Sequence, residues 1–538
     1  MKRSITRIAA MLICALILLP CLPFGAQAAA KYAVREPQPD KENDPNDPSA
    51  AQNISGIELL TAYSGLSNPT QLFDKDKITE LDSWGNPRLT LEYEDGIGSL
   101  YLIFGEVYGC YTVINNDTGA SVTCGQNNFY HEVIRLTDLF GGPVRSVTLD
   151  FADGAVRLIE IHAYTQGYLP DYVQEWQLPE ENKTDLILFS THGDDEQLFF
   201  AGLLPYYCAL DYEVLVVYMT DHRNLHDCRV HEMLNGLWAC GVTTYPVFGS
   251  YDDIFTEDMN LLYTVFGWQG VTRDELIGYV VEQLRRFKPM VVVGHDFAGE
   301  YKHGQHMVYA DMLAAALAVS NDANAYPELA EKYGLWDVPK AYFHLYEENP
   351  IIMDWDTPME ELDGMTPFEV TQLLGYTQHI SQRESWVSNW INGEHFDIHK
   401  AADIEKYSPC EYGLYRSTVG PDILKNDMFE NVLSYAQQEK KAEEDRLAEL
   451  ERQEAERKAA EESAQQEAER KAAEQEAERK AAEEARLAEE ARAEEQARNR
   501  IIWMILICVG IGSIMLIALA VLFAPRRHGH YEKRKKEK

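Results

Sequence analysis

The chain has 538 residues and a formal net charge of −39 at pH 7. This length is too great for one compact core, so we expect two or more domains with additional segments. The acidic balance argues against nucleic acid as a partner, because its phosphates would be repelled.

The N-terminus has the three parts of a secretory signal peptide. Met1–Arg3 is basic, an apolar run extends from Ile8 to Leu19, and Ala26–Ala28 forms a small-x-small cleavage site. The apolar run is short for a membrane span and two prolines follow it. We therefore predict a signal peptide over residues 1–28, followed by a polar, proline-rich linker over residues 29–53.

Residues 54–168 contain short β-type runs, such as Ser99–Phe104, separated by turn residues. Many short strands without a helical period predict a β-sandwich. Asn68–Asp74, then the strands, then Val156–Tyr164 occur in an order that resembles a galactose-binding-like (discoidin-type) domain. The resemblance implies either carbohydrate binding or a purely structural role, and both stay open.

Residues 183–425 alternate strands and helices, which predicts a Rossmann-like α/β domain with a parallel sheet. Helices are expected over Glu196–Leu204, Arg229–Trp238 and Arg273–Phe287. The three strands nearest these helices end at Thr191-His192, Thr220-Asp221 and His295-Asp296. Ligands bind beyond the carboxyl ends of parallel strands, so these polar groups predict a site at one edge of the sheet.

Two further histidines, His303 and His306, follow the third of these strands, one helical turn apart. His192, Asp195 and His306 offer two imidazoles and a carboxylate, the donor set of a catalytic zinc site with one open position. Asp194 is a candidate base for the activated water. His303 is a candidate to stabilise an oxyanion or to protonate the leaving amine. Together these groups predict metal-assisted hydrolysis of an amide.

The same residues resemble the signature of the PIG-L/LmbE-like de-N-acetylases. His192–Glu196 matches the family's His-Pro-Asp-Asp-Glu except at Gly193, and His303–His306 matches its His-x-x-His, with Glu300-Tyr301 before it. Arg229 with Glu232 matches an Arg-x-x-Glu, and His379–Gln382 matches a His-x-Ser-Gln. The resemblance extends from about Thr184 to Asp427.

This resemblance implies hydrolysis of an N-acetyl group on a glucosamine-type sugar, with Zn²⁺ or another divalent metal as cofactor. It implies that His192, Asp195 and His306 bind the metal and that Asp194 is the base. It also implies that His303 aids the transition state and that Arg229 and Tyr301 contact the substrate. Two positions depart from the family. Gly193 replaces a proline and is expected to loosen the ligand loop, and Lys302 stands where glycine is common.

Residues 426–500 are rich in Ala, Glu, Lys, Arg and Gln and repeat Glu-Ala-Glu-Arg-Lys-Ala-Ala from Glu454, Glu467 and Glu476. Each repeat places Glu four residues before Lys, which supports an exposed helix. The segment lacks the sustained apolar seam that a strict coiled coil requires, so we predict a charged helical stalk. At about 1.5 Å per residue it would be on the order of 100 Å long. A loosely self-associating helix, a form of coiled coil, is the alternative.

Residues 501–524 are apolar without a charge, which predicts a transmembrane helix, and the basic residues 525–538 predict a cytoplasmic tail. The domains before the span are then expected outside the cell, on a single-pass anchor in the cell membrane. In an oxidising compartment Cys110 and Cys124 could be bridged.

We therefore predict a membrane-anchored, extracytoplasmic zinc-dependent deacetylase acting on N-acetylglucosamine-type sugars or glycans. One alternative is a non-catalytic cell-surface glycan-binding protein with a decayed enzyme domain. Another is an amidase acting on a small thiol–sugar conjugate, which export disfavours because such thiols belong to the cytoplasm.

Overall fold

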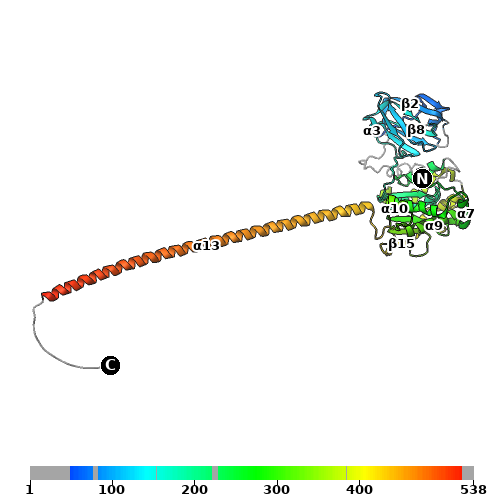
Figure 1. Ribbon diagram of the computed structural model, residues 1–538. Coiled ribbons are helices and arrows are strands. Elements are labelled where there is room, and N and C mark those ends of the chain that lie inside the picture. The colour runs from blue at the N-terminus through cyan, green and yellow to red at the C-terminus, as the bar shows by residue number, and fades with distance from the viewer. Residues whose placement is uncertain are drawn as a thin grey trace, which may run out of the picture. The chain divides into compact units, whose positions relative to one another are not determined.

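The computed structural model describes residues 49–76, 81, 83–152, 154–220, 228–382 and 385–523. The predicted signal peptide, most of the linker and the basic C-terminal tail lie outside these residues. The chain divides into two compact units, residues 1–440 and 441–538. Figure 1 colours the chain by residue number, so the elements of the first unit run from blue to yellow and those of the second from yellow-orange to red. The first unit contains a β-sandwich and an α/β domain, so the multidomain prediction is confirmed.

The sandwich consists of two antiparallel sheets. The larger sheet contains, in spatial order, β1 (Leu60–Leu66), β2 (Ser83–Ile97), β7 (Val144–Asp150), β4 (Tyr111–Asn115) and β5 (Ser121–Cys124). The smaller sheet contains β6 (His131–Arg135), β3 (Ser99–Phe104) and β8 (Leu158–Tyr164). The short helix α3 (Leu136–Phe140) follows β6. The predicted sandwich is therefore present, whereas its resemblance to galactose-binding-like domains stays a prediction.

Strand β3 shows how the sequence forms this sandwich. Leu100, Leu102 and Phe104 lie in the core between the two sheets. Tyr101 and Ile103 point to the opposite face, where they pack in a second buried cluster. Side chains alternate along a strand, so a continuous apolar run is buried on both faces.

The α/β domain is built on a seven-stranded mixed sheet. Its spatial order is β11 (Val247–Phe248), β10 (Val214–Tyr218), β9 (Leu186–Ser190), β12 (Val291–Gly294), β13 (Lys340–His344), β15 (Glu411–Ser417) and β14 (Pro350–Ile352). The first five strands are parallel, as predicted. Strand β15 is antiparallel to both β13 and β14, so the prediction of a wholly parallel sheet is wrong at this edge. An antiparallel edge added to a parallel sheet is common.

Helices cover both faces of this sheet, and the strand residues alternate between them. Leu186 and Leu188 of β9 pack in one core cluster, and Ile187 and Phe189 pack in the other. The first face is covered by α5 (Leu203–Ala209) and α6 (Arg229–Ala239). The second is covered by α7 (Met259–Trp268), α8 (Arg273–Phe287) and α9 (Gly304–Val319). The shorter helices are α4 (Asp195–Leu198), α10 (Pro327–Tyr333), α11 (Pro367–Glu369) and α12 (Asn389–Asn392).

The predicted helices α6 and α8 are confirmed, and α8 begins with a capping box formed by Thr272 and Glu275. The predicted helix over Glu196–Leu204 is instead divided into α4 and α5. Gly202 between them has a φ of 92°, which glycine adopts readily, and a Cβ there would contact Trp355. This close approach of another segment is not visible from the local sequence.

The sandwich and the α/β domain contact each other directly within the first unit. The backbone N–H of Tyr130 donates to the Tyr245 hydroxyl at 3.0 Å. His131 Nε2 and His231 Nδ1 lie 2.8 Å apart and are both buried. Tyr130 also belongs to the core cluster of the α/β domain. The two folds are therefore packed against each other rather than joined only through the chain.

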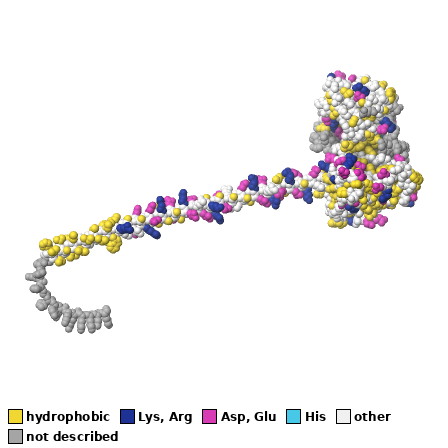
Figure 2. All heavy atoms as spheres, viewed as in Figure 1, with side chains coloured by type: hydrophobic (Ala, Val, Ile, Leu, Met, Phe, Trp, Pro, Cys, Tyr) yellow, Lys and Arg dark blue, Asp and Glu magenta, His cyan; other side chains and the backbone are white. Residues whose placement is uncertain are grey.

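The described residues of the second unit belong almost entirely to the long helix α13 (Tyr435–Leu522), whose first residues lie in the first unit. The predicted ion pairs Glu454–Lys458, Glu467–Lys471 and Glu476–Lys480 have N–O distances of 3.1, 2.7 and 2.9 Å. They are exposed, so each contributes only about 0.2–0.5 kcal/mol. Figure 2 shows the charged part of the helix giving way to apolar side chains toward its C-terminal end. By length and composition, α13 contains a segment that could cross a membrane.

Cys110 and Cys124 are both free thiols. Tyr111 pairs with Cys124 across β4 and β5. Cys110 precedes Tyr111, so its side chain is expected to point to the opposite face from that of Cys124. This register agrees with the absence of a bridge between the two cysteines.

Candidate active site

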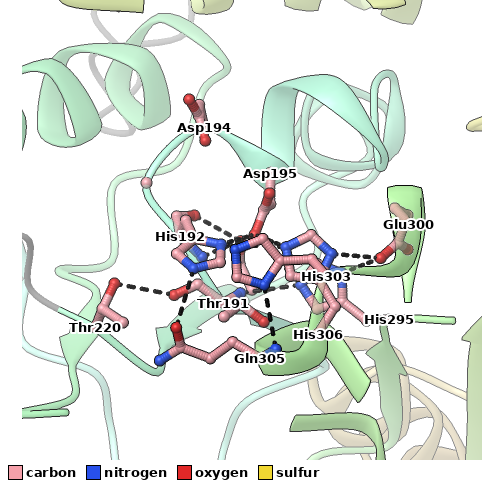
Figure 3. Close-up of polar contacts among 12 residues, drawn as sticks. Thr191, His192, Asp194, Asp195, Thr220, His295, Glu300, His303, Gln305 and His306 are labelled. Carbon is pink, nitrogen blue, oxygen red and sulfur yellow. Dashed lines mark hydrogen bonds and ion pairs between the residues drawn. The ribbon is translucent and has the colours of Figure 1, made fainter. Parts of the chain in front are cut away.

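The predicted site residues converge at the carboxyl edge of the parallel strands (Figure 3). The strand order reverses between β9 and β12, where doubly wound sheets bind their ligands. His192 follows β9 and Asp195 begins α4. His295 follows β12, and His306 lies in the first turn of α9. Residues more than 100 positions apart thus meet because parallel strands end at the same edge.

Three ligand-type atoms form a nearly equilateral triangle. His192 Nδ1 lies 3.1 Å from Asp195 Oδ2 and 3.1 Å from His306 Nε2. The third side, from His306 Nε2 to Asp195 Oδ2, is 3.2 Å. All three residues are buried. The structure therefore brings together the three residues predicted as metal ligands.

The outer nitrogens of the two histidines have acceptors, which determines where their protons lie. His306 Nδ1 donates to Glu300 Oε2 at 2.7 Å. His192 Nε2 lies 3.4 Å from both Asp253 Oδ1 and Gln305 Oε1. In a neutral imidazole one nitrogen is a donor and the other is an acceptor. His192 Nδ1 and His306 Nε2 therefore present lone pairs to the triangle.

Two other buried histidines lie close enough to be considered as ligands, but their hydrogen bonds exclude them. The backbone N–H of Thr191 donates to His295 Nε2 at 3.0 Å, and His295 Nδ1 donates to Glu300 at 2.9 Å. His303 Nδ1 accepts the N–H of Gln305 at 3.1 Å, as the N-cap of α9, so its proton is on Nε2. Neither ring has a free lone pair to offer a metal.

The triangle fits a divalent metal. Four tetrahedral ligands at about 2.0–2.1 Å from zinc lie about 3.3 Å from one another. The observed separations of 3.1–3.2 Å are close to this value. Two imidazoles and one carboxylate also suit several other divalent transition metals. The residues therefore match a three-ligand site with one open position.

Glu300 is the centre of a hydrogen-bond network that supports this triangle. Its buried carboxylate accepts from His295, His306 and His344, and from the backbone N–H of Asp296 at 3.2 Å. Burial opposes the charged form, but the attraction of His295 and the three imidazole hydrogen bonds lower the pKa of Glu300 well below its usual range. Glu300 therefore stays ionised and fixes the proton of His306 on Nδ1.

The supporting role of Glu300 was not predicted, and neither was that of His344, Asp253 or Gln305. A signal for His344 existed in the sequence, because β13 ends on this histidine and another histidine, His295, directly follows β12. The other three lie in loops or at a helix start. Nothing in their local sequence indicates which ring nitrogen they face.

Residues 187–317 match the PIG-L family, described as GlcNAc-PI de-N-acetylase. This stretch begins in β9 and ends in α9, and it contains all three residues of the triangle. Residues 187–317 are a PIG-L domain. The predicted boundaries, 183–425, are wider and include β13, β14 and β15, which lie outside the matched residues.

Three known proteins are similar to part of this chain. The 1D-myo-inositol 2-acetamido-2-deoxy-alpha-D-glucopyranoside deacetylase 2 of Saccharopolyspora erythraea is 35% identical over 116 residues, which is 21% of this chain and 40% of that protein. The corresponding deacetylase of Streptomyces avermitilis is 22% identical over 295 residues, 46% of this chain and 97% of that protein. The N,N'-diacetylchitobiose deacetylase of Pyrococcus horikoshii is 16% identical, with 44% of this chain and 83% of that chain covered and a TM-score of 0.29.

Asp194 of the PIG-L domain does not join the triangle. Figure 3 shows its carboxylate pointing away from the imidazoles. Arg229 Nη2 lies 3.2 Å from Asp194 Oδ2, and Arg229 Nη1 donates to Glu232 at 2.8 Å. Glu232 in turn accepts the N–H and the hydroxyl of Ser381, both at 2.7 Å. Arg229 is only 4% exposed, so it is held as a buried ion-pair partner of Asp194.

Gly193 stands where the resemblance predicts a proline, and a neighbouring side chain fills the space beside it. A Cβ at this position would overlap the side chain of Met233, which is fully buried. Met233 of α6 therefore occupies the space beside the ligand loop, so the loop is packed rather than loose. His379, for which the sequence indicated no role, is also buried, with Nδ1 3.4 Å from Arg229 Nη1.

Tyr301 and Lys302 both have left-handed backbone, with φ of 45° and 60°. Glycine adopts this conformation at least cost, so the backbone at Lys302 is strained relative to a glycine at the same position. The Tyr301 ring lies 5.4 Å from that of His306 and 5.3 Å from that of His303. Burial, followed by the electrostatic influence of the neighbouring imidazoles of His192 and His306, lowers the pKa of His303 to about 2. The predicted residues Tyr301 and His303 are thus placed beside the triangle.

Proposed function

We propose that this protein is a zinc-dependent hydrolase that removes N-acetyl groups from N-acetylglucosamine-type sugars or glycans. The observation that carries the proposal is the triangle of His192, Asp195 and His306, in which both imidazoles present lone pairs. The PIG-L match and the names of the two curated relatives, both deacetylases of an acetamido sugar, support this reaction class.

The reaction adds water across the amide, so that the C–N bond breaks and acetate and an amine are formed. When bound, a divalent cation lowers the pKa of water and polarises the acyl carbonyl. His303 carries its proton on Nε2, because Nδ1 caps α9. That N–H favours the first of the two predicted roles, a hydrogen bond to the oxyanion of the tetrahedral intermediate.

Asp194 is the base in this proposal. A base must come within hydrogen-bond distance of the proton that it accepts. In this proposal, the Asp194 side chain rotates toward the triangle from its present position beside Arg229. Arg229 then orients this carboxylate, and Tyr301 lies on the substrate side. The proton taken from water is returned to the leaving amine.

We place this reaction outside the cytoplasm, with the chain anchored by residues 501–524 and the basic tail inside. The support is the signal-type N-terminus and the apolar part of α13. The charged part of α13 is then the stalk between the membrane and the enzyme.

Acetate release from N-acetylglucosamine oligomers by the full-length protein in detergent tests the proposal. We expect chelation to abolish release and zinc to restore it. His306→Ala and Asp194→Asn should each lower it at least about a hundredfold. His395→Ala, at an exposed histidine outside the site, is the matched control and should keep full activity. Undiminished release by His306→Ala would refute the proposal.

Metal analysis separates the two main alternatives. About one zinc per chain after gentle purification supports the enzyme. A substoichiometric metal content together with oligosaccharide binding would instead favour the glycan-binding protein with a decayed enzyme domain.

A further inference from the structure

A group of aromatic rings leads from the predicted metal ligands to the surface. The Tyr301 ring lies 5.4 Å from His306 and 4.7 Å from Trp390. Trp386 lies 5.8 Å from Tyr301, and Phe255 lies 6.4 Å from Tyr301 and 5.1 Å from His303. Phe255 and Trp386 thus each contact Tyr301, whose ring lies beside His306 of the triangle.

The two outer rings are largely exposed, although they belong to a packed cluster. Phe255 is 64% exposed and Trp386 is 61% exposed, whereas Tyr301 and Trp390 are partly buried. Phe255 lies between β11 and α7, and Trp386 begins the short helix Trp386–Ser388. Separate segments therefore bring two exposed aromatic side chains to the same site. Grouped exposed apolar side chains of this kind mark binding surfaces.

The rings are oriented differently around Tyr301. Phe255 is nearly parallel to Tyr301, with 9° between the ring planes. Trp386 is nearly perpendicular to it, at 86°. The two exposed rings consequently lie close to a right angle to each other. They offer two distinct flat faces rather than one continuous apolar strip.

The charged side chains that flank Phe255 in the chain are acidic. Asp253, two residues before Phe255, contacts His192. Glu257 lies two residues from Phe255 and is exposed. An anionic ligand would be repelled here, whereas a neutral one would not. The C–H face of a pyranose ring is apolar, its edge is polar, and it stacks on an aromatic face.

We propose that Phe255 and Trp386 are stacking positions for the sugar units next to the one being deacetylated. The substrate class is then a neutral N-acetylated glycan of several units, rather than a single amino sugar or an acyl-tailed one. The inference rests on the proposed deacetylase function, because the position of the reacting unit is taken from the triangle. An acyl chain would favour a continuous apolar groove, which two separate perpendicular faces do not provide.

The test is the chain-length dependence of kcat/KM for acetate release by the zinc-loaded full-length protein. The substrates are N-acetylglucosamine and its β-1,4 dimer, trimer and tetramer. We expect kcat/KM to rise about tenfold or more from monomer to tetramer. Phe255→Ala and Trp386→Ala should each reduce the tetramer-to-monomer ratio about three- to tenfold, the size of one aromatic stacking contact.

Two control variants sharpen this comparison. Trp386→Tyr keeps an aromatic face and should keep most of the ratio. Trp268→Ala removes an aromatic ring that is 77% exposed at the end of α7 and should leave the ratio unchanged. Calorimetric titration of the tetramer into each protein measures the same contacts without turnover. Weaker binding in both site variants supports the inference, and unchanged binding overturns it.

The outcomes for the two proposals are distinguishable. Acetate release with equal kcat/KM for the monomer and all three oligomers would leave the deacetylase proposal standing and overturn the stacking positions. No release from any oligomer, despite bound zinc, would overturn the deacetylase function, while the titration still decides whether the rings bind sugar. A larger gain from a long alkyl glycoside of N-acetylglucosamine than from the tetramer would overturn the glycan assignment in favour of an acyl-tailed substrate.

Discussion

Replacing Glu300 with glutamine would place an amide NH₂ where the surroundings provide only donors. One carboxylate oxygen accepts from His295 and His306, and the other accepts from His344 and from the backbone of Asp296. Whichever of the two oxygens is replaced by the amide nitrogen, the two N–H groups that donated to that oxygen then face another donor. The imidazoles can relieve this conflict by moving their protons. For His306, that change places hydrogen on Nε2 and removes the lone pair from the triangle.

The size of the effect follows from these contacts. A hydrogen bond to a charged group contributes about 1.5–3 kcal/mol, and outer partners of metal ligands change affinity about 10–100-fold when they are lost. A hundredfold change corresponds to about 2.7 kcal/mol, so the two figures agree. We therefore expect Glu300→Gln to weaken zinc binding about 10–100-fold and to lower the melting temperature by several degrees.

Competition with a chelating dye at fixed pH measures the zinc affinity, and thermal unfolding measures the stability. Glu132→Gln is the matched control. Glu132 is a partly buried carboxylate of the sandwich that accepts from the Tyr111 hydroxyl at 2.7 Å and the Gly125 N–H at 3.0 Å. The Glu132→Gln variant should be less stable but should bind zinc with unchanged affinity. An unchanged zinc affinity in Glu300→Gln would show that this carboxylate does not fix the tautomer of His306.

Three further variants test other parts of the structure. Gly193→Ala should lower the melting temperature because its Cβ overlaps Met233; Met233→Ala should recover part of the loss, and strict additivity in a double-mutant cycle would contradict this contact. His303→Asn should reduce kcat about 10²–10³-fold while zinc affinity is retained, since His303 is not a ligand; loss of the metal would disprove the tautomer assignment. Lys340→Met should destabilise the fold by about 3–5 kcal/mol, because the buried Asp422, 2.5 Å from the lysine Nζ, loses its cationic partner and keeps only the Tyr342 hydroxyl as a donor. Denaturant unfolding measures this loss, and the double variant with Asp422→Leu should regain most of it.

Much of the architecture could be predicted from local patterns. Apolar runs ending in polar residues indicated β9, β10 and β12, and helical spacing indicated α6 and α8. Since parallel strands end at a common edge, the same patterns also indicated that His192 and His306 would meet. The division of α4 from α5 and the antiparallel strand β15 could not be predicted. They depend on Trp355 approaching Gly202 and on a strand that returns from far along the chain.

The sequence by itself determined which chemical groups are present and which edge of the sheet they occupy, because both follow from strand periodicity and residue type. Tertiary structure alone decided which imidazoles can bind a metal. Four buried histidines surround Asp195, and the sequence cannot rank them by proton position. The ranking depends on Glu300, Asp253 and the backbone N–H groups of Thr191 and Gln305, which reach the rings only after the chain has folded. A ring nitrogen is a donor or an acceptor according to its partner, and that partner is a property of the fold.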